Sequence, residues 1–258
     1  MDEPRHRARN CVKRQISNGS RNTQRGYQYT WDRTELCMFA LELDHIVVFS
    51  SRDAPEKKRL EEIGLHGFGG VTRHGDLGSA STSFFFSNLL YLELLWIHDE
   101  EAARRNFEPL TMNTIPRMNW RHSNAAPLNL MLRSRQPGAT VSPPFPVHQL
   151  QLPGGAFVGF NGETLAEPCY GVVPEEMSFR GFQADIPDLP HPLGVKRLTA
   201  VGLTVAARSL SPIARLMTEH GIASIELGTE PLATLTFDNG IQNKSADLRP
   251  MLPLVLKY

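Results

Sequence analysis

The chain has 258 residues, 41% of them hydrophobic, and its 27 Lys and Arg residues are balanced by 27 Asp and Glu residues. This length is sufficient for a sizeable core in one domain or in two fused modules. The balanced charge gives no reason to expect a nucleic-acid partner. The longest apolar stretch, from Phe84 to Ile97, is too short and too polar for a membrane span. Three widely separated cysteines predict neither a disulfide framework nor a zinc knuckle, and they indicate a reducing, cytoplasmic location; they are Cys11, Cys37 and Cys169.

Residues 1–37 differ in composition from the rest of the chain. Basic side chains lie there among Asn, Gln, Ser and Gly, with almost nothing to bury, so we expect a disordered basic tail. A mitochondrial presequence and a nucleic-acid-binding arm are two interpretations of such a tail. A third is an upstream extension of little structural consequence, with translation beginning at Met38.

The segment 38–98 predicts one strand, one helix and three more strands. A strand pattern covers 41–50, and a helix pattern covers 55–63, with Pro55 near its start and Gly64 just after its end. Further strand patterns lie near 66–73, 82–87 and 90–97, and they are separated by Gly, Asp, Ser and Asn. We therefore expect a first βαβββ module here.

The long middle segment, 99–196, predicts little regular structure. A helix is expected at 100–107, and many prolines separate short strand candidates such as 129–134 and 148–152. Irregular segments of this kind cover surfaces or line pockets. We expect the segment to connect the modules and to act as a lid over the site, with Trp120, Arg121 and Phe182 contacting substrate.

The last segment, 197–258, repeats the order of the first. It predicts a strand at 197–205, a helix at 211–220, and strands at 223–227, 233–237 and 253–257. A repeat of this length is stronger evidence than any single element, even where sequence identity is weak. We therefore expect a second βαβββ module at 197–258.

One carboxylate lies in a strand that is otherwise apolar on both faces. Glu93 interrupts the run from Leu89 to Ile97, and a carboxylate buried in such a strand needs a cation, a proton or hydrogen-bond donors. The first strand carries His45, which the two-residue strand period places on the same face as Leu43, Val47 and Phe49. On neighbouring strands, His45 and Glu93 would make half of a metal site.

Four stretches carry a resemblance to a known family. They are the opening strand Leu43–Val48, the loop Gly75–Ser81, the closing strand Tyr91–Leu94, and His191–Gly194 followed by Arg197–Val201. From about Leu41 onward the chain resembles the vicinal oxygen chelate superfamily, and specifically its glyoxalase-like branch. The pair Leu-Asp-His and Tyr-Leu-Glu-Leu at this spacing is more specific than either motif alone.

The resemblance implies an α+β fold in which two βαβββ modules form a cupped, partly closed mixed sheet around a metal or a small ligand. In metal-dependent members, the first and last strands of each module contribute one ligand each. His45 and Glu93 occupy the two positions of the first module, and both suit Zn²⁺, Mn²⁺, Ni²⁺ or Fe²⁺. In the aligned repeat, the other two positions hold Ala200 and Val255, which cannot coordinate a metal.

A third ligand would have to come from the middle segment. Candidates are His122, His148, Glu163, Glu167, Gln183 and Asp185. We expect Gln183, because it lies in a strand-like run, 179–185. The alternative is that no metal binds and that the imidazole of His45 is hydrogen-bonded to Glu93 itself.

Two functions from different classes follow. The first is a metal-dependent lyase, isomerase or dioxygenase that acts on a small substrate, with Glu93 as ligand or catalytic base. The second is a non-catalytic protein that binds a small molecule in the same cup.

No nucleotide cofactor is expected, because Gly67–Gly70 does not match a dinucleotide fingerprint. The loop at Arg73–Gly75 either binds an anion at the mouth of the cup or is simply solvated. We expect a monomer or a homodimer, without a nucleic-acid or membrane partner.

Overall fold

The computed structural model describes residues 39–151, 157–183 and 190–258. The predictions for the basic tail and for Met38 lie outside the described residues, as does Asp185. In the described part, no helix is both long enough and apolar enough to cross a membrane.

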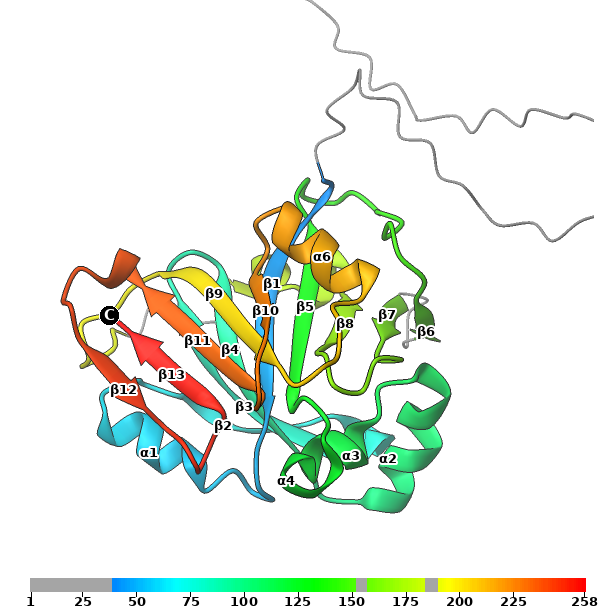
Figure 1. Cartoon of the computed structure of the whole chain (residues 1–258), viewed down its shortest axis with the longest axis horizontal. Helices are drawn as coiled ribbons and strands as arrows, with labels where there is room; N and C mark the ends of the chain where they lie inside the picture. The colour runs from blue at the N-terminus through cyan, green and yellow to red at the C-terminus, as the bar shows by residue number, and fades with distance from the viewer. Residues whose placement is uncertain (1–38, 152–156, 184–189) are drawn as a thin grey trace, which may run out of the picture. The chain divides into compact units, whose positions relative to one another are not determined.

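Eight strands form the larger sheet, sheet A, in the order β2-β3-β4-β1-β5-β8-β7-β6 (Figure 1). Its two halves share one pairing pattern: β1 is parallel to β4, β5 is parallel to β8, and β1 and β5 run antiparallel at the centre. The strands of the first half are β1 (Leu41–Phe49), β2 (Phe68–Arg73), β3 (Ser79–Phe86) and β4 (Leu90–Ile97). The strands of the second half are β5 (Leu128–Ser134), β6 (His148–Gln151), β7 (Phe157–Asn161) and β8 (Cys169–Val172).

Five strands form a second sheet, sheet B, in the order β10-β9-β11-β13-β12. The strands β9 and β10 are parallel, while β11 is antiparallel to β9 and parallel to β13. The bounds are β9 (Leu198–Val205), β10 (Ser224–Leu227), β11 (Leu232–Phe237), β12 (Ser245–Asp247) and β13 (Leu254–Lys257), with helix α6 (Pro212–Glu219) between β9 and β10.

The other helices are short. They are α1 (Glu56–Glu62), α2 (Glu100–Phe107), α3 (Thr114–Met118), α4 (Trp120–Ser123) and α5 (Phe179–Phe182), with 3-10 turns η1 (Gly75–Leu77), η2 (Glu108–Leu110), η3 (Glu175–Met177) and η5 (Asp238–Gly240). The N-cap Asp99 of α2 accepts a hydrogen bond from the amide of Ala102, and Ser211 does the same for Ala214 at α6.

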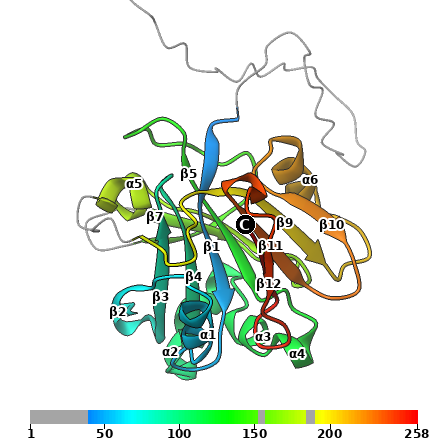
Figure 2. The ribbon, with the colours of Figure 1, turned by 90° about the vertical axis from the view of Figure 1, so that its left-hand side faces the viewer.

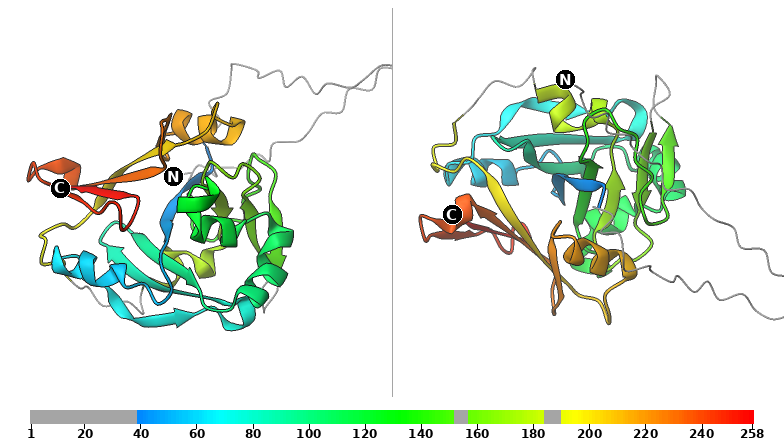
Figure 3. Two further views of the ribbon diagram at one scale, coloured as in Figure 1. Left: turned by 60° about the horizontal axis from the view of Figure 1, so that its bottom comes forward. Right: turned by 90° about the horizontal axis from the view of Figure 1, so that it is seen from above.

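The predicted fold class is confirmed. The protein is α+β, with two mixed sheets that each end in two edge strands and therefore do not close, and the arrangement is consistent with a fold built from βαβββ modules. The right-hand view of Figure 3 shows the strands of sheet B (yellow to red) as a group separate from those of sheet A (blue to green).

The location of the second set of strands differs from our expectation. We placed the second module at 197–258, but the strands that extend β1–β4 lie at 128–172, inside the segment predicted as a lid. Periodicity along the chain indicates that a segment forms a strand, but it does not say which strand becomes its neighbour. The boundaries 38–98, 99–196 and 197–258 stay predictions as domain boundaries.

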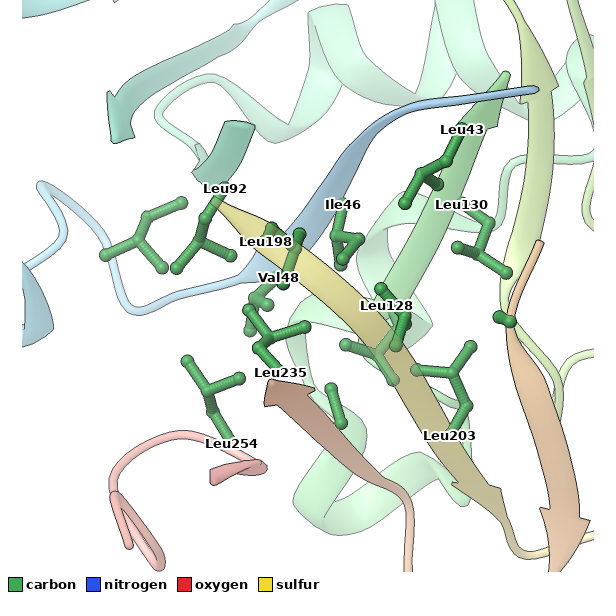
Figure 4. Close-up of a cluster of buried hydrophobic side chains, with 14 of the residues drawn as sticks. Leu43, Ile46, Val48, Leu92, Leu128, Leu130, Leu198, Leu203, Leu235 and Leu254 are labelled. Atoms are coloured by element: carbon green, nitrogen blue, oxygen red, sulfur yellow. The ribbon is translucent and has the colours of Figure 1, made fainter. Parts of the chain in front are cut away.

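The two sheets share one hydrophobic core. Leucine, isoleucine and valine side chains of β1, β4 and β5 meet those of β9, β11 and β13. Figure 4 shows this interface, and its labelled side chains are Leu43, Ile46, Val48, Leu92, Leu128, Leu130, Leu198, Leu203, Leu235 and Leu254. Figure 2 shows β9 and β11 beside β1 from a second direction.

A buried carboxylate also joins the two sheets. Glu167, which precedes β8 and is fully buried, accepts hydrogen bonds of 2.6 Å from both the amide and the hydroxyl of Ser211 at the start of α6. The hydroxyl of Tyr170 donates a third, at 3.0 Å. Three hydrogen-bond donors from two parts of the chain therefore stabilise the buried charge of Glu167.

The opposite face of sheet A has its own core. Val47, Phe49 and Leu95 pack there with residues of α2 and α3, including Phe107 and Ile115. We call this the site face, because it also carries His45 and Glu93.

Candidate functional site

A β-bulge in β1 places two polar side chains next to each other. The register with β5 shifts between Leu43 and His45, so that Asp44 is the extra residue of the bulge. Leu43 therefore packs in the core between the sheets, whereas Val47 lies on the site face. Our expectation that Leu43 shares a face with His45 was wrong, because the strict two-residue period does not continue through a bulge.

Asp44 orients the ring of His45. This fully buried carboxylate accepts a hydrogen bond from His45 Nδ1 at 2.7 Å through Oδ2. Its other oxygen, Oδ1, accepts from Arg133 Nη1 and from the backbone amide of Phe179, each at 3.0 Å. Because a carboxylate can only accept, the imidazole proton lies on Nδ1. In the neutral ring, Nε2 then carries the lone pair.

Glu93 lies between two imidazoles. Its Oε2 is 3.6 Å from Nε2 of His45, and its Oε1 is 3.8 Å from Nε2 of His74. Both distances are too long for a direct hydrogen bond. His45 and Glu93 lie within ion-pair distance without a direct hydrogen bond, so the alternative in which these two side chains pair without a metal stays open. In the part of the chain that the structure describes, no three His, Cys, Asp or Glu side chains are already set around one metal position.

The loop between β2 and β3 carries His74 to this point. Its Nδ1 lies 2.8 Å from the hydroxyl of Ser79, and its Nε2 lies 3.2 Å from that of Ser81. The turn continues through η1 to Gly78, where φ is +76° and where a Cβ would collide with the backbone of Asp99 and Ala103. Only glycine fits such a position. The side chain of His74 is 26% exposed, so it lies at the edge of the site.

Aromatic rings line the site beside His45. The ring of Tyr91 stacks on His45 with a centroid distance of 4.2 Å, and Phe85 and Phe179 pack on Tyr91 at 5.1 and 6.0 Å. Phe182 completes this cluster at 6.3 Å from Tyr91. Burial, together with the charges of Glu93 and Asp44, raises the pKa of Tyr91 well above its usual value. Tyr91 therefore stays a neutral phenol.

The second half of sheet A presents different chemistry to the same face. Met131 of β5 lies in the site-face core and fills the space above Gly171, where a Cβ would collide with its sulfur and methyl group. Arg133 reaches Asp44, as described above, and also Glu42 at 2.8 Å. Cys169 of β8 is fully buried, and this burial raises the pKa of its thiol to about 11, so it is a poor nucleophile.

Of the predicted site residues, Phe182 packs on Tyr91 beside His45, and Gln183 lines a cavity that Phe85 and Phe179 of the same aromatic cluster also line. Gln183 is exposed and lines a cavity of about 450 Å³ with His66, Phe68 and Lys196. Among the described residues, no hydrogen bond joins Gln183 to His45 or Glu93. The run 179–185 was predicted as a strand, but its described part forms α5, because Ser178 caps the helix by accepting from the amide of Gly181.

Trp120 and Arg121 lie on α4. Arg121 stacks over the ring of Trp120 at 4.4 Å and donates hydrogen bonds to the carbonyls of Pro250 and Met251 at 2.7 and 2.6 Å. These contacts tie α4 to the loop before β13. Arg121 also lines a second cavity of about 460 Å³, with His98 and other residues. Substrate contact by Trp120 and Arg121 stays a prediction.

Ala200 and Val255, aligned above with the missing ligands, belong to sheet B. Ala200 is exposed and Val255 is half-buried, and neither lies in a strand of sheet A. The positions in sheet A that correspond to the first half lie on β5 and β8 instead. The alignment matched the order of the elements, and that order does not reveal which strands pair.

Sequence reasoning missed two residues of the site. Asp44 was read only as part of a motif, and no feature of the local sequence predicted that it would be the bulged residue. His74 was noted only as part of a loop, although its position before two alternating serines, Ser79 and Ser81, was a signal that could have placed it against the strand.

No protein-family model matches the chain, and no curated protein matches its sequence. A solved structure of a hypothetical protein from Staphylococcus aureus is similar over 84% of this chain and 99% of its own, at 12% identity and a TM-score of 0.48. A hypothetical protein from Bacillus halodurans covers 52% of this chain and 94% of its own, at 14% identity and a TM-score of 0.33. The solved structure of methylmalonyl-CoA epimerase from Mycobacterium tuberculosis is similar over 55% of this chain and 93% of its own, at 10% identity and a TM-score of 0.31. At TM-scores below 0.5, these likenesses do not assign the chain to a family.

Proposed function

We propose that the chain is a glyoxalase-like protein of the vicinal oxygen chelate type. In this proposal, a divalent cation such as Zn²⁺, Mn²⁺, Ni²⁺ or Fe²⁺ binds between His45 and Glu93, and the protein acts as a lyase, isomerase or dioxygenase on a small substrate. A cytoplasmic location belongs to the same proposal.

One observation carries the proposal. The lone pair of His45 Nε2 faces Oε2 of Glu93 across 3.6 Å, while Nδ1 is held by Asp44. Two ligands of one cation with bond lengths of about 2.1 Å lie about 3.0–3.4 Å apart, so a small shift of either side chain would bring this pair to that spacing. A carboxylate that holds the far nitrogen of a ligating histidine is the usual support of such a ligand. The donors present therefore fit a divalent metal.

The residues around the pair have defined tasks in this proposal. When bound, the metal polarises two adjacent oxygen atoms of the substrate. Asp44 keeps the proton of His45 on Nδ1, and the charge of Glu93 offsets that of the cation. A carboxylate oxygen of Glu93 that does not bind the cation can accept a proton from the substrate. The rings of Tyr91 and Phe179 exclude water from one side.

A second candidate is a non-catalytic protein that binds a small molecule. It is favoured by the second half of sheet A, which offers Met131 and Arg133 on β5 and Gly171 on β8. No imidazole or carboxylate of the described part of β5 or β8 points to the site face. Two protein ligands hold a divalent cation weakly, so this candidate predicts a ligand-binding cup without metal.

Metal analysis distinguishes the two candidates. Protein purified without chelator, then dialysed against each of the four cations, is compared with His45→Ala and Glu93→Gln, and with His148→Ala as a control. His148, one of the candidate ligands from the sequence, is exposed on β6, which β7, β8 and β5 separate from β1, and its ring lies 3.5 Å from Glu163. The enzyme proposal expects stoichiometric metal in the wild type and the control, and its loss in both site variants. Wild type that binds none of the four cations would refute it.

A further inference from the structure

The proposed metal site has a third side chain beside it. This inference rests on the proposed function: we propose that His74 is the third protein ligand. A bound cation would be held by Glu93 and by the two imidazoles, which lie on either side of that carboxylate. The site is then a set of two histidines and one glutamate with open positions for substrate.

The distances around Glu93 support this arrangement. His45 faces Oε2 at 3.6 Å and His74 faces the other oxygen, Oε1, at 3.8 Å. Both separations exceed by a few tenths of an ångström the roughly 3.0–3.4 Å between two ligands of one cation, so a small shift of the side chains would bring them to that spacing.

Both histidines are oriented in the same way. Each has Nδ1 anchored by a side-chain oxygen, His45 by Asp44 at 2.7 Å and His74 by Ser79 at 2.8 Å. Each then turns Nε2 toward Glu93. With its proton on Nδ1 and donated to Ser79, His74 keeps a lone pair on Nε2, as a metal ligand requires.

A modest adjustment completes the site. No three such side chains of the described residues already surround one metal position, so His74 or Glu93 has to shift when the cation binds. His74 is the more mobile choice, because its side chain is 26% exposed and is followed by Gly75 in a turn. The hydroxyl of Ser81, 3.2 Å from Nε2, would give up its contact to the cation.

The competing interpretation is that His74 is a loop residue satisfied by the two serine hydroxyls. Gln183, the ligand predicted from sequence, is a weaker candidate because it is exposed and lines another cavity. The two interpretations of His74 differ in one measurable property, namely whether the coordination sphere of the bound metal changes when the imidazole is removed.

Cobalt(II) is a suitable probe, since its visible absorption reports coordination number and ligand type. The full chain is titrated with Co²⁺ as wild type, His74→Ala, His74→Gln, His45→Ala and the control His148→Ala, and the fold of each is checked by circular dichroism. We expect His74→Ala and His74→Gln to lose at least about 10-fold in affinity and to show altered absorption bands, with the control unchanged.

The outcomes separate this inference from the function on which it rests. If the His74 variants bind Co²⁺ with wild-type affinity and spectrum while His45→Ala does not, His74 is not a ligand and the proposed function stands. If wild type itself does not bind Co²⁺, both proposals fail. Should His74→Ala misfold, His74→Gln supplies the comparison, because its amide retains a hydrogen-bonding group for the two serines.

Discussion

Replacing Asp44 by Asn tests the link between the bulge and the metal site. Both donors to Oδ1, Arg133 and the amide of Phe179, lie at 3.0 Å, and they fix the carbonyl of the new amide in the Oδ1 position. The amino group therefore takes the Oδ2 position and faces His45 Nδ1, from which Asp44 accepts at 2.7 Å. Because this amino group donates, Nδ1 of His45 has to accept the hydrogen bond, and the proton of the ring moves to Nε2.

The expected magnitude follows from this change of tautomer. A protonated Nε2 cannot bind a cation, and loss of such a supporting carboxylate typically lowers metal affinity about 10- to 100-fold. This corresponds to about 1.4–2.8 kcal/mol of binding free energy. The fold should persist, since Arg133 keeps its second partner, Glu42, at 2.8 Å.

Two measurements check this prediction. Isothermal titration with Zn²⁺ gives the affinity, and a two-bond ¹H–¹⁵N correlation spectrum of histidine-labelled protein identifies the protonated nitrogen of His45. Glu42→Gln is the matched control, because Glu42 pairs with Arg133 and Arg180 but does not contact His45. If Asp44→Asn leaves Nδ1 protonated and the affinity equal to that of the control, the reasoning is refuted.

Three further predictions concern stability. Ser211→Ala should lower the free energy of unfolding by about 1–2 kcal/mol, because it removes both the cap of α6 and a bond to Glu167; a urea midpoint equal to wild type would contradict this. Burial lowers the pKa of His191, so its neutral form stabilises the fold above the ordinary histidine pKa and this contribution is lost as pH falls through the lowered value. Unfolding by urea at about pH 7 and about pH 5 should therefore show a smaller pH dependence for His191→Gln than for wild type. Phe179→Ala should destabilise by about 3 kcal/mol, since this buried ring packs on Phe85 at 4.6 Å, and a loss below about 1 kcal/mol would show that the aromatic cluster is loosely packed.

Much of the local structure could be predicted from the sequence. The patterns at 41–50 and 90–97 became β1 and β4, and those at 55–63 and 211–220 became α1 and α6. The burial of Glu93 in an apolar strand was likewise visible, because both faces of β4 are lined by apolar side chains. These features depend on neighbours within a few residues, which is the range over which periodicity carries information.

The candidate site was only partly predictable. His45 and Glu93 lie near each other as expected, yet Asp44 and His74 entered only with the structure. The bulge at Asp44 arises from the register between β1 and β5, two strands that are more than 80 residues apart in sequence. The strand geometry assumed for Gln183 does not exist, because a local cap made the described part of its segment helical, and its role as a ligand stays a prediction.

The sequence by itself indicated most strands and helices of the first and last segments, and it predicted that one imidazole and one carboxylate share a buried face. The tertiary structure alone decided that β5 and β8, rather than the strands of sheet B, continue the sheet beside β1. It also decided that His74 reaches Glu93 across the loop before β3. The physical reason is that strand pairing and loop closure depend on contacts between distant segments, and many such pairings satisfy the same local hydrophobic pattern.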